Sequence, residues 1–235
     1  TGLDWNTVVE NERCKSGQVK NLIYSSSSAP HYNWRSTSVG YNCATDKWSP
    51  YDGTVWFAAS DDLVKYYLDP RTYLSENYIF CFENLSYVSG MQTQPGVEAI
   101  LAGSFMSNTY PRGSSSTYSS VMMSAASDSK VSPYFIASRI KQEIGNTASG
   151  SVTGTNGSYP GIYNFYNIGA NDTAGGGAIE KGLSWATSGS TYLRPWNTPY
   201  KSITGGAMYI GEKYIYKGQN TLYTQKFNVT YTGML

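Results

Sequence analysis

The best-defined pattern of apolar positions is a row of isoleucines at every fourth residue, the spacing of one helix face: Ile136, Ile140 and Ile144. Ser132 followed by Pro133 is typical of a helix start, because the serine hydroxyl caps free backbone N–H groups and proline suits the first turn. Gly145 is typical of a helix end. The sequence therefore predicts a helix over residues 133–144.

Apolar residues recur at three- and four-residue intervals in five other stretches, which predicts further helices: residues 61–68, 74–85, 95–105, 178–186 and 203–215. Asp69-Pro70 ends the first of these, and Gly218 ends the last. Residues 107–120 are rich in small polar residues and predict a loop. Residues 146–161 are rich in Gly, Ser and Thr and predict a hairpin or a mobile lobe.

Residues 1–60 show no regular period. They hold a serine run and four tryptophans, and we interpret them as loops and short strands packed onto the helical region: Trp5, Trp34, Trp48 and Trp56. At the other end, the tail from Leu222 is expected to pack back on the domain through Phe227 and Val229. Helices dominate, so the predicted fold class is α+β, mostly α.

Composition narrows the classes of function. Only 14% of the residues are charged, and 17 Lys and Arg nearly balance 16 Asp and Glu, so net charge does not drive binding to nucleic acid or an anionic membrane. No run of about 18 apolar residues predicts a membrane span. The 22 tyrosines and many small polar residues suit an extracellular protein that binds sugars or polymers. The chain starts at Thr1 without a charged-then-apolar leader, so we expect any signal peptide to have been removed or left out.

Histidine and cysteine usage excludes several chemistries. His31 is the only histidine, so a zinc hydrolase with two or three His ligands cannot form, and a Ser-His-Asp triad would have to use this residue. Cys81 lies in an apolar run and is interpreted as a small buried residue. Cys14 and Cys43 lie in polar segments and are either bridged or free. A Cys–His dyad is disfavoured, since no apolar helix stands behind Cys14, and we expect no metal and no cofactor.

Glu143 is the sharpest candidate for chemistry. On the predicted helix it lies seven residues after Ile136 and three after Ile140, about 20° off the edge of the isoleucine row. A carboxylic acid that loses hydration there stays protonated to higher pH, which suits the proton donor of a glycosidase. The alternative is a helix-end Glu that reaches into water or pairs with Lys or Arg.

An aromatic and amide cluster forms the second candidate, in residues 163–169. Flat aromatic faces stack on sugar rings, and amides orient hydroxyl and N-acetyl groups. Four residues supply these contacts: Tyr163, Asn164, Tyr166 and Asn167. In this interpretation Tyr166 and Asn164 orient the substrate or the attacking water. The alternative is that Phe165 and Ile168 are core residues and the tyrosines cover them.

Five segments carry a resemblance to a known family. They are YFIASRIKQEIG (134–145), SGSVTGT (149–155), YNFYNIGA (163–170) and runs within 68–83 and 205–229. In combination and in order they resemble the bacterial cell-wall glucosaminidases of glycoside hydrolase family 73, and within it the branch of Bacillus and Clostridium vegetative autolysins. The resemblance covers roughly residues 60–230.

The resemblance implies a lysozyme-like helical domain with a small β-lobe beside the cleft. It implies an endo-β-N-acetylglucosaminidase that hydrolyses the bond after N-acetylglucosamine in peptidoglycan glycan strands. The predicted catalytic residues are Glu143, at the position of the family's catalytic acid, and Tyr166. The predicted substrate-binding residues are Gln142, Tyr163, Asn164, Asn167 and Tyr223. Many relatives carry Gly at the position of Asn167.

A second carboxylate is harder to find. Asp172 and Glu180 follow the aromatic cluster and either face Glu143 across a cleft or serve as capping and surface residues. They lie beside or beyond the glycines 175–177, which we interpret as a hinge, so neither is expected to be held tightly. The 2-acetamido group of the substrate can replace a second carboxylate by attacking its own anomeric carbon. We therefore favour Glu143 with substrate assistance over a carboxylate pair.

The sequence thus predicts a secreted, cell-wall-associated autolysin domain, monomeric, with peptidoglycan strands as its partner. It predicts an N-terminal extension, residues 1–58, packed on a catalytic domain, residues 59–235. One alternative is a lytic transglycosylase, which also uses one acidic Glu but leaves an anhydro sugar. The other is a non-catalytic module that binds cell-wall glycan, to which the tryptophans before residue 60 would contribute.

Overall fold

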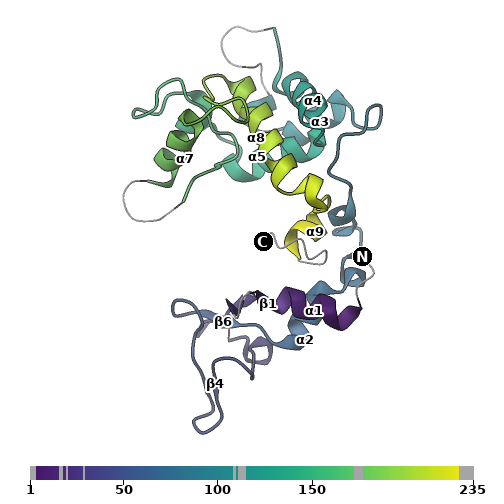
Figure 1. Ribbon diagram of the computed structural model, residues 1–235, viewed down its shortest axis with the longest axis vertical. Coiled ribbons are helices and arrows are strands. Elements are labelled where there is room, and N and C mark those ends of the chain that lie inside the picture. Colours follow the sequence, from purple (N-terminus) through teal and green to yellow (C-terminus); the bar gives the residue numbers. More distant parts are fainter. Residues whose placement is uncertain are drawn as a thin grey trace. The chain divides into compact units, whose positions relative to one another are not determined.

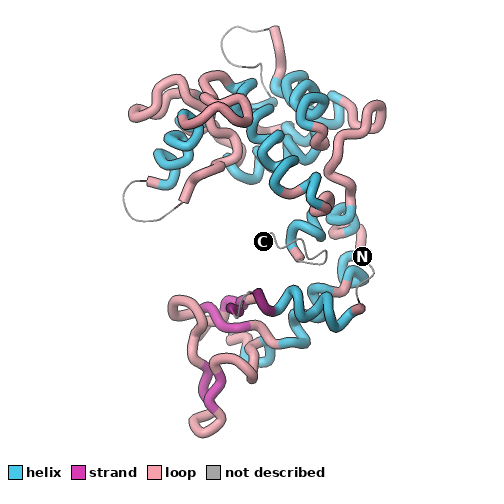
Figure 2. Tube along the Cα trace, viewed as in Figure 1, coloured by secondary structure: helices cyan, strands magenta, loops and turns pink. Residues whose placement is uncertain are grey.

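The computed structural model describes residues 4–15, 18–19, 21–28, 30–107, 110, 115–171 and 177–227. The chain divides into two compact units (Figure 1). Unit 1 comprises Thr1–Glu83 with Thr221–Leu235, and unit 2 comprises Asn84–Asn220. Among the described residues the strands all lie in unit 1, whereas unit 2 consists of helices, turns and loops (Figure 2).

Unit 2 is built around α4, which packs against α3, α5 and α8. Its described elements are α3 (Gln94–Leu101), η4 (Phe105–Ser107), α4 (Tyr118–Ser129), α5 (Pro133–Ile144), α6 (Gly150–Thr153), α7 (Ala178–Thr187), α8 (Pro199–Lys213) and η5 (Ile215–Lys217). The helices enclose one core whose large buried side chains include Leu101, Met122, Ile136, Ile140, Phe165 and Ile203. This core fixes the position of α5 and of the loop around Phe165.

The helix predicted from the isoleucine row is confirmed in full by α5. The Ser132 hydroxyl accepts a hydrogen bond from the Phe135 N–H at 3.5 Å, and Pro133 occupies the first turn. Gly145 ends the helix with φ of +82°, a conformation that costs glycine little. The buried isoleucines of the row turn toward the core, so Glu143 lies at the edge of the buried face.

Two helix predictions differ from the structure. Residues 74–85 form no α-helix and contain only a short 3-10 helix, η3 (Ile79–Phe82). The spaced apolar residues share no buried face: Leu74 is 62% and Tyr78 is 59% exposed, whereas Leu85 is buried. Helix α4 was missed. Its buried positions include Ser119, Ala125 and Ser129 beside larger residues, so the apolar row that marks a helix face is interrupted.

The small strands do not lie where the hairpin was predicted. Residues 146–161 form α6 and turns, so the predicted hairpin is not present, while the other prediction for this segment, a mobile lobe, stays a prediction. The strands instead form three antiparallel pairs in unit 1: β1 (Cys14–Lys15) with β2 (Gln18–Val19), β3 (Leu22–Tyr24) with β6 (Trp56–Ala58), and β4 (Tyr41–Asn42) with β5 (Lys47–Trp48). The predicted class, α+β and mostly α, is confirmed.

Unit 1 has its own core, formed by buried residues from both of its chain segments: Val8, Val9, Leu68, Tyr73, Tyr223 and Phe227. They come from or lie beside α1 (Trp5–Arg13), α2 (Asp61–Leu68), η2 (Pro70–Tyr73) and α9 (Leu222–Lys226). Because α2 and η2 contribute to this core, the boundary between the units follows Glu83 and not residue 58. The C-terminal segment packs back through Phe227, as predicted, whereas Val229 lies outside the described residues.

Two further sequence expectations concern cysteines and membranes. Cys43 is an exposed free thiol, so the bridge to Cys14 is not formed, and Cys81 is half-buried. None of the described helices is long and apolar enough to cross a membrane.

Buried tyrosines make the stability of the protein sensitive to alkali. Burial raises the pKa of Tyr73, Tyr110 and Tyr223 to about 12, whereas an unfolded tyrosine titrates near 10. The unfolded state therefore loses these protons first as the pH rises, and stability is expected to fall between about pH 10 and pH 12 while it is fully retained below pH 10. Urea unfolding followed by circular dichroism from pH 8 to pH 12 measures this, and a constant free energy of unfolding across that range would contradict it.

Candidate active site

Glu143 lies in the last turn of α5 with its carboxylate accessible to solvent. Its side chain is 24% exposed, and Oε1 forms an ion pair with Arg139, 2.7 Å from Nη2. Arg139 is one helical turn earlier, so the two side chains meet on the same face of the helix. The ion pair restrains the orientation of the carboxylate.

Asn167 connects this carboxylate to the loop of the aromatic cluster. Its Nδ2 group lies 3.2 Å from the backbone oxygen of Glu143 and 3.4 Å from Oε2. The backbone at Asn167 has φ of +53°, a left-handed conformation that glycine and asparagine adopt most readily. This conformation explains physically why glycine is an alternative at this position, and it directs the asparagine amide toward Glu143.

Asn164 organises the same loop from inside. Its side chain is buried, with Nδ2 donating to the backbone oxygens of Ile168 at 2.9 Å and Gly182 at 3.1 Å. Its Oδ1 accepts from the backbone N–H groups of Tyr166 and Ile168. These contacts give Asn164 a structural role in the loop, and its contact with substrate stays a prediction.

Tyr163 and Tyr166 are enclosed in the core, which removes sugar stacking in this structure, while the catalytic role expected for Tyr166 stays a prediction. They are 1% and 4% exposed, and the Tyr166 hydroxyl donates to the backbone oxygen of Ile203 at 2.8 Å. The Tyr166 ring lies so close to Gly206 that a Cβ there would be 2.1 Å from Cδ2. Enclosed rings cannot stack on a sugar, so the alternative interpretation, in which Phe165 is core, holds in this structure.

Tyr223 and Gln142 lie in different settings. Tyr223 is part of the unit 1 core, where its hydroxyl donates to the backbone oxygen of Leu68, and its substrate contact stays a prediction. Gln142 is exposed on α5, directly before Glu143 in the chain. Of the predicted substrate-binding residues, Gln142 and Asn167 therefore accompany Glu143.

Of the two candidates for a second carboxylate, Asp172 and Glu180, the structure describes only Glu180. Asp172 lies outside the described residues. Glu180 is in the first turn of α7, where its Oε1 accepts from Asn156 Nδ2 at 3.5 Å and its Oε2 lies over Gly177, the residue that precedes the helix. Gly177 has no side chain to cap the helix, and the negative charge of Glu180 in the first turn is favourable at the positive end of the helix dipole.

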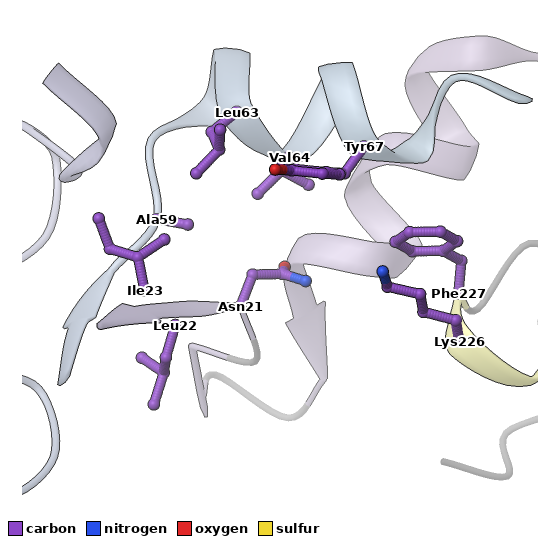
Figure 3. Close-up of a pocket in the computed structure, with 9 residues that line it drawn as sticks. All are labelled: Asn21, Leu22, Ile23, Ala59, Leu63, Val64, Tyr67, Lys226 and Phe227. Atoms are coloured by element: carbon purple, nitrogen blue, oxygen red, sulfur yellow. The ribbon is translucent and has the colours of Figure 1, made fainter. Parts of the chain in front are cut away.

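The candidate site is not the apolar pocket of unit 1. That pocket has a volume of about 320 Å³ and is lined by side chains such as Leu22, Leu63 and Phe227, with the Asn21 amide and the Lys226 ammonium among them (Figure 3). No carboxylate lines it, so it offers no proton donor. In the part of the chain that the structure describes, no group of three or more His, Cys, Asp or Glu residues is placed to bind a metal ion.

Arg139 is the residue of the site that sequence reasoning missed. The signal was present, because an arginine four residues before a helical glutamate is placed to form an ion pair with it. The general alternative that Glu143 pairs with Lys or Arg anticipated the contact but not its partner.

Substitution of Asn167 tests whether its hydrogen bonds to Glu143, at the end of α5, matter for activity. Asn167→Gly is expected to keep the left-handed backbone but to lose the contacts with Glu143, so activity falls while the fold is retained. Asn167→Ala adds a Cβ to the left-handed conformation and is expected to be less stable than Asn167→Gly by about 1–2 kcal/mol. Turnover and denaturant unfolding of both variants measure this. Equal activity of Asn167→Gly and the unmodified protein would show that the amide does not serve Glu143.

The sequence relatives and the solved structures that resemble this chain carry the same kinds of name, glucosaminidase and autolysin. No family model matches the chain. The β-N-acetylglucosaminidase of Bacillus subtilis is 29% identical over 181 residues, which are 75% of this chain and 19% of that protein. A bifunctional autolysin of Staphylococcus aureus is 34% identical over 82 residues, 35% of this chain and 6% of the relative. The chain thus spans about a fifth or less of the length of these curated relatives.

Solved structures share the fold. Glucosaminidase B of S. aureus is 26% identical, with a TM-score of 0.58 over 79% of this chain and 68% of its own. The major bifunctional autolysin has a TM-score of 0.51 at 23% identity, over 74% of this chain and 66% of its own, and supports the fold. Sequence and fold agree: the chain is similar in sequence to a bacterial β-N-acetylglucosaminidase and shares the fold of solved glucosaminidase domains.

Proposed function

We propose that this chain is the catalytic domain of a peptidoglycan hydrolase, an endo-β-N-acetylglucosaminidase that cleaves the β-1,4 bond after N-acetylglucosamine. The observation that carries the proposal is the Glu143 carboxylate, solvent-accessible at the end of α5 and held by Arg139 and Asn167. The names of the relatives, a β-N-acetylglucosaminidase and bifunctional autolysins, support this activity. We also propose that the enzyme is a secreted, wall-associated autolysin that acts as a monomer without a cofactor.

In the first step Glu143, as the carboxylic acid, donates its proton to the glycosidic oxygen while the bond from that oxygen to C1 breaks. The oxygen of the 2-acetamido group forms a bond to C1 on the opposite face and gives a cyclic oxazolinium ion. Arg139 and Asn167 then stabilise the carboxylate that remains on Glu143, because both present N–H donors to its oxygens.

In the second step water attacks C1 and the bond from C1 to the acetamido oxygen breaks. The Glu143 carboxylate accepts the proton of this water and returns to the acid form. One carboxylate therefore serves as acid and then as base, in a position that the two donors restrain.

Removal of either candidate second carboxylate is expected to cost less activity than removal of Glu143. Glu180→Gln keeps the shape of the side chain and weakens only its support of the α7 N-terminus, an effect of about 0.3–1 kcal/mol on stability. Asp172→Asn is the parallel variant. The measurement is the turnover of each variant on purified peptidoglycan, compared with the turnover of Glu143→Gln. A loss from either variant as large as that from Glu143→Gln, with the fold intact, would replace this mechanism with a two-carboxylate one.

Mass spectrometry of digested sacculi tests the reaction itself. The expected products end in reducing N-acetylglucosamine. An anhydro-N-acetylmuramic acid end would show a lytic transglycosylase instead, since that enzyme also needs only one acidic Glu. No loss of turbidity and no released fragments would favour a module that binds wall glycan without cleaving it.

A further inference from the structure

Unit 1 carries exposed aromatic residues that the reaction proposed for Glu143 does not use. We define the aromatic platform by its residues: His31, Tyr32, Trp34, Arg35 and Trp48. They come from the short turn η1 (Tyr32–Trp34), its flanks and β5. Tyr32 is 54% and Trp34 is 44% exposed, although large aromatic side chains are usually well buried. A surface that keeps such rings in water is typical of a binding site.

Contacts within the protein hold the two most exposed rings in place. The His31 ring stacks on Trp34 with centroids 4.2 Å apart and planes 11° from parallel. The Arg35 guanidinium lies over the Tyr32 ring, 4.6 Å from its centroid, and is itself anchored by a 2.6 Å hydrogen bond to Ser25 Oγ. Each ring therefore has a partner on one face, and its exposed area is available to a ligand. Because the rings are already ordered, binding costs little side-chain entropy.

A hollow beside these rings has the size of a small ligand. It has a volume of about 270 Å³ and is formed by the backbone and side chains of residues 30–34. Small-molecule pockets start at about 300 Å³, so this hollow accommodates one ring of a longer ligand. Asn33 lines it and is exposed, which places an amide donor and acceptor next to the aromatic faces.

We propose that the aromatic platform binds one N-acetylglucosamine-containing segment of a glycan strand, with a sugar ring stacked on Tyr32 or Trp34. The C–H face of a pyranose is weakly positive and fits the negative face of an aromatic ring. Arg35, the one charged member of the platform, is held by Ser25 and Tyr32, so its guanidinium supports the Tyr32 ring from one face while the amide of Asn33 supplies a neutral polar contact for the sugar.

This inference rests on the proposed function, because a polymeric substrate presents such a ring at every repeat. A second contact with the same polymer raises the effective concentration of glycan near the enzyme without any change at Glu143. Other ligands of aromatic surfaces, a proline-rich peptide or a second copy of the chain, are distinguished from glycan by the outcomes of the binding experiment.

The experiment measures binding to purified, teichoic-acid-free sacculi by co-sedimentation, with every variant made in the Glu143→Gln protein so that cleavage does not interfere. Tyr32→Ala and Trp34→Ala are each expected to weaken binding by about three- to tenfold. Trp34→Phe keeps a flat ring and is expected to retain most of the affinity. Tyr66→Ala is the matched control, because Tyr66 is 59% exposed in the same unit and lies outside the platform.

Soluble N-acetylglucosamine oligomers are expected to release the protein from sacculi and to lose affinity in the same two alanine variants. The proposal is overturned if these variants, with unchanged melting temperature, bind as tightly as Tyr66→Ala. It is also overturned if only a proline-rich peptide competes, or if Trp34→Ala changes the sedimentation coefficient from dimer to monomer. Failure of the proposed function is seen separately, as the absence of new reducing ends when the protein with intact Glu143 is incubated with sacculi.

Discussion

Replacement of Glu143 by Gln is expected to lower the rate of peptidoglycan cleavage by about 10²–10⁴-fold, because the amide cannot donate the proton that the leaving oxygen needs. The fold is expected to survive. The side chain is partly exposed, and the single Gln oxygen can still accept from one of the two donors, Arg139 or Asn167, which contact different oxygens of Glu143. Release of reducing sugar from purified sacculi, together with the melting temperature, measures both effects.

Glu212→Gln provides the matched control for this variant. Glu212 lies near the end of α8 in the same unit, its side chain is 58% exposed, and it pairs with Lys213. Exposed ion pairs contribute little, so this variant is expected to keep both activity and stability. If Glu143→Gln turned over at the same rate as Glu212→Gln, Glu143 would not be the acid, and the ion pair with Arg139 would be a surface contact only.

Replacement of Tyr166 by Ala is expected to lower the free energy of unfolding by about 3–5 kcal/mol, the range for loss of a buried aromatic side chain. The ring fills the space over Gly206, and its hydroxyl satisfies the backbone oxygen of Ile203. Tyr166→Phe removes only the hydrogen bond and is expected to cost about 1 kcal/mol. Urea unfolding of the two variants measures these losses, with Tyr214→Ala, at 38% exposure, as a control that loses less.

Activity separates a packing role of Tyr166 from a catalytic one. If the tyrosine only packs, Tyr166→Phe retains the turnover of the unmodified protein under conditions in which it is fully folded. A large loss of turnover in Tyr166→Phe, with stability nearly unchanged, would show that the Tyr166 hydroxyl takes part in catalysis, as the sequence predicts.

The aromatic cluster shows why some site predictions differ from the structure. Tyr163, Asn164 and Tyr166 have side chains with both apolar and polar parts. Such residues are equally typical of a hydrogen-bonded core and of a sugar-binding surface. Burial decides between the two, and burial depends on what α8 places opposite the loop. Gly206 and Ile203 receive the Tyr166 ring and hydroxyl, and neither is near it in sequence.

Arg139 and Asn167 illustrate the two kinds of contact that support the candidate acid. Arg139 is a neighbour of Glu143 through the regular helix repeat, so local spacing contains the information. Asn167 reaches Glu143 only because the loop turns back on the end of α5 with a left-handed residue. The family resemblance pointed to the segment, and the comparisons confirm that relationship, but the direction of the amide is a property of the folded loop.

By itself the sequence determined the elements whose signals are local: α5 with its serine and glycine caps, α2, the mostly helical class and Glu143 at the edge of the isoleucine row. These follow from hydrogen bonding and side-chain spacing within about a dozen residues. Only the tertiary structure decided that α2 belongs to unit 1, that Tyr166 and Tyr223 are enclosed, and that Asn167 faces Glu143. The physical reason is that burial and hydrogen-bond partners of these residues come from segments distant in the chain, whose approach depends on packing of the whole unit.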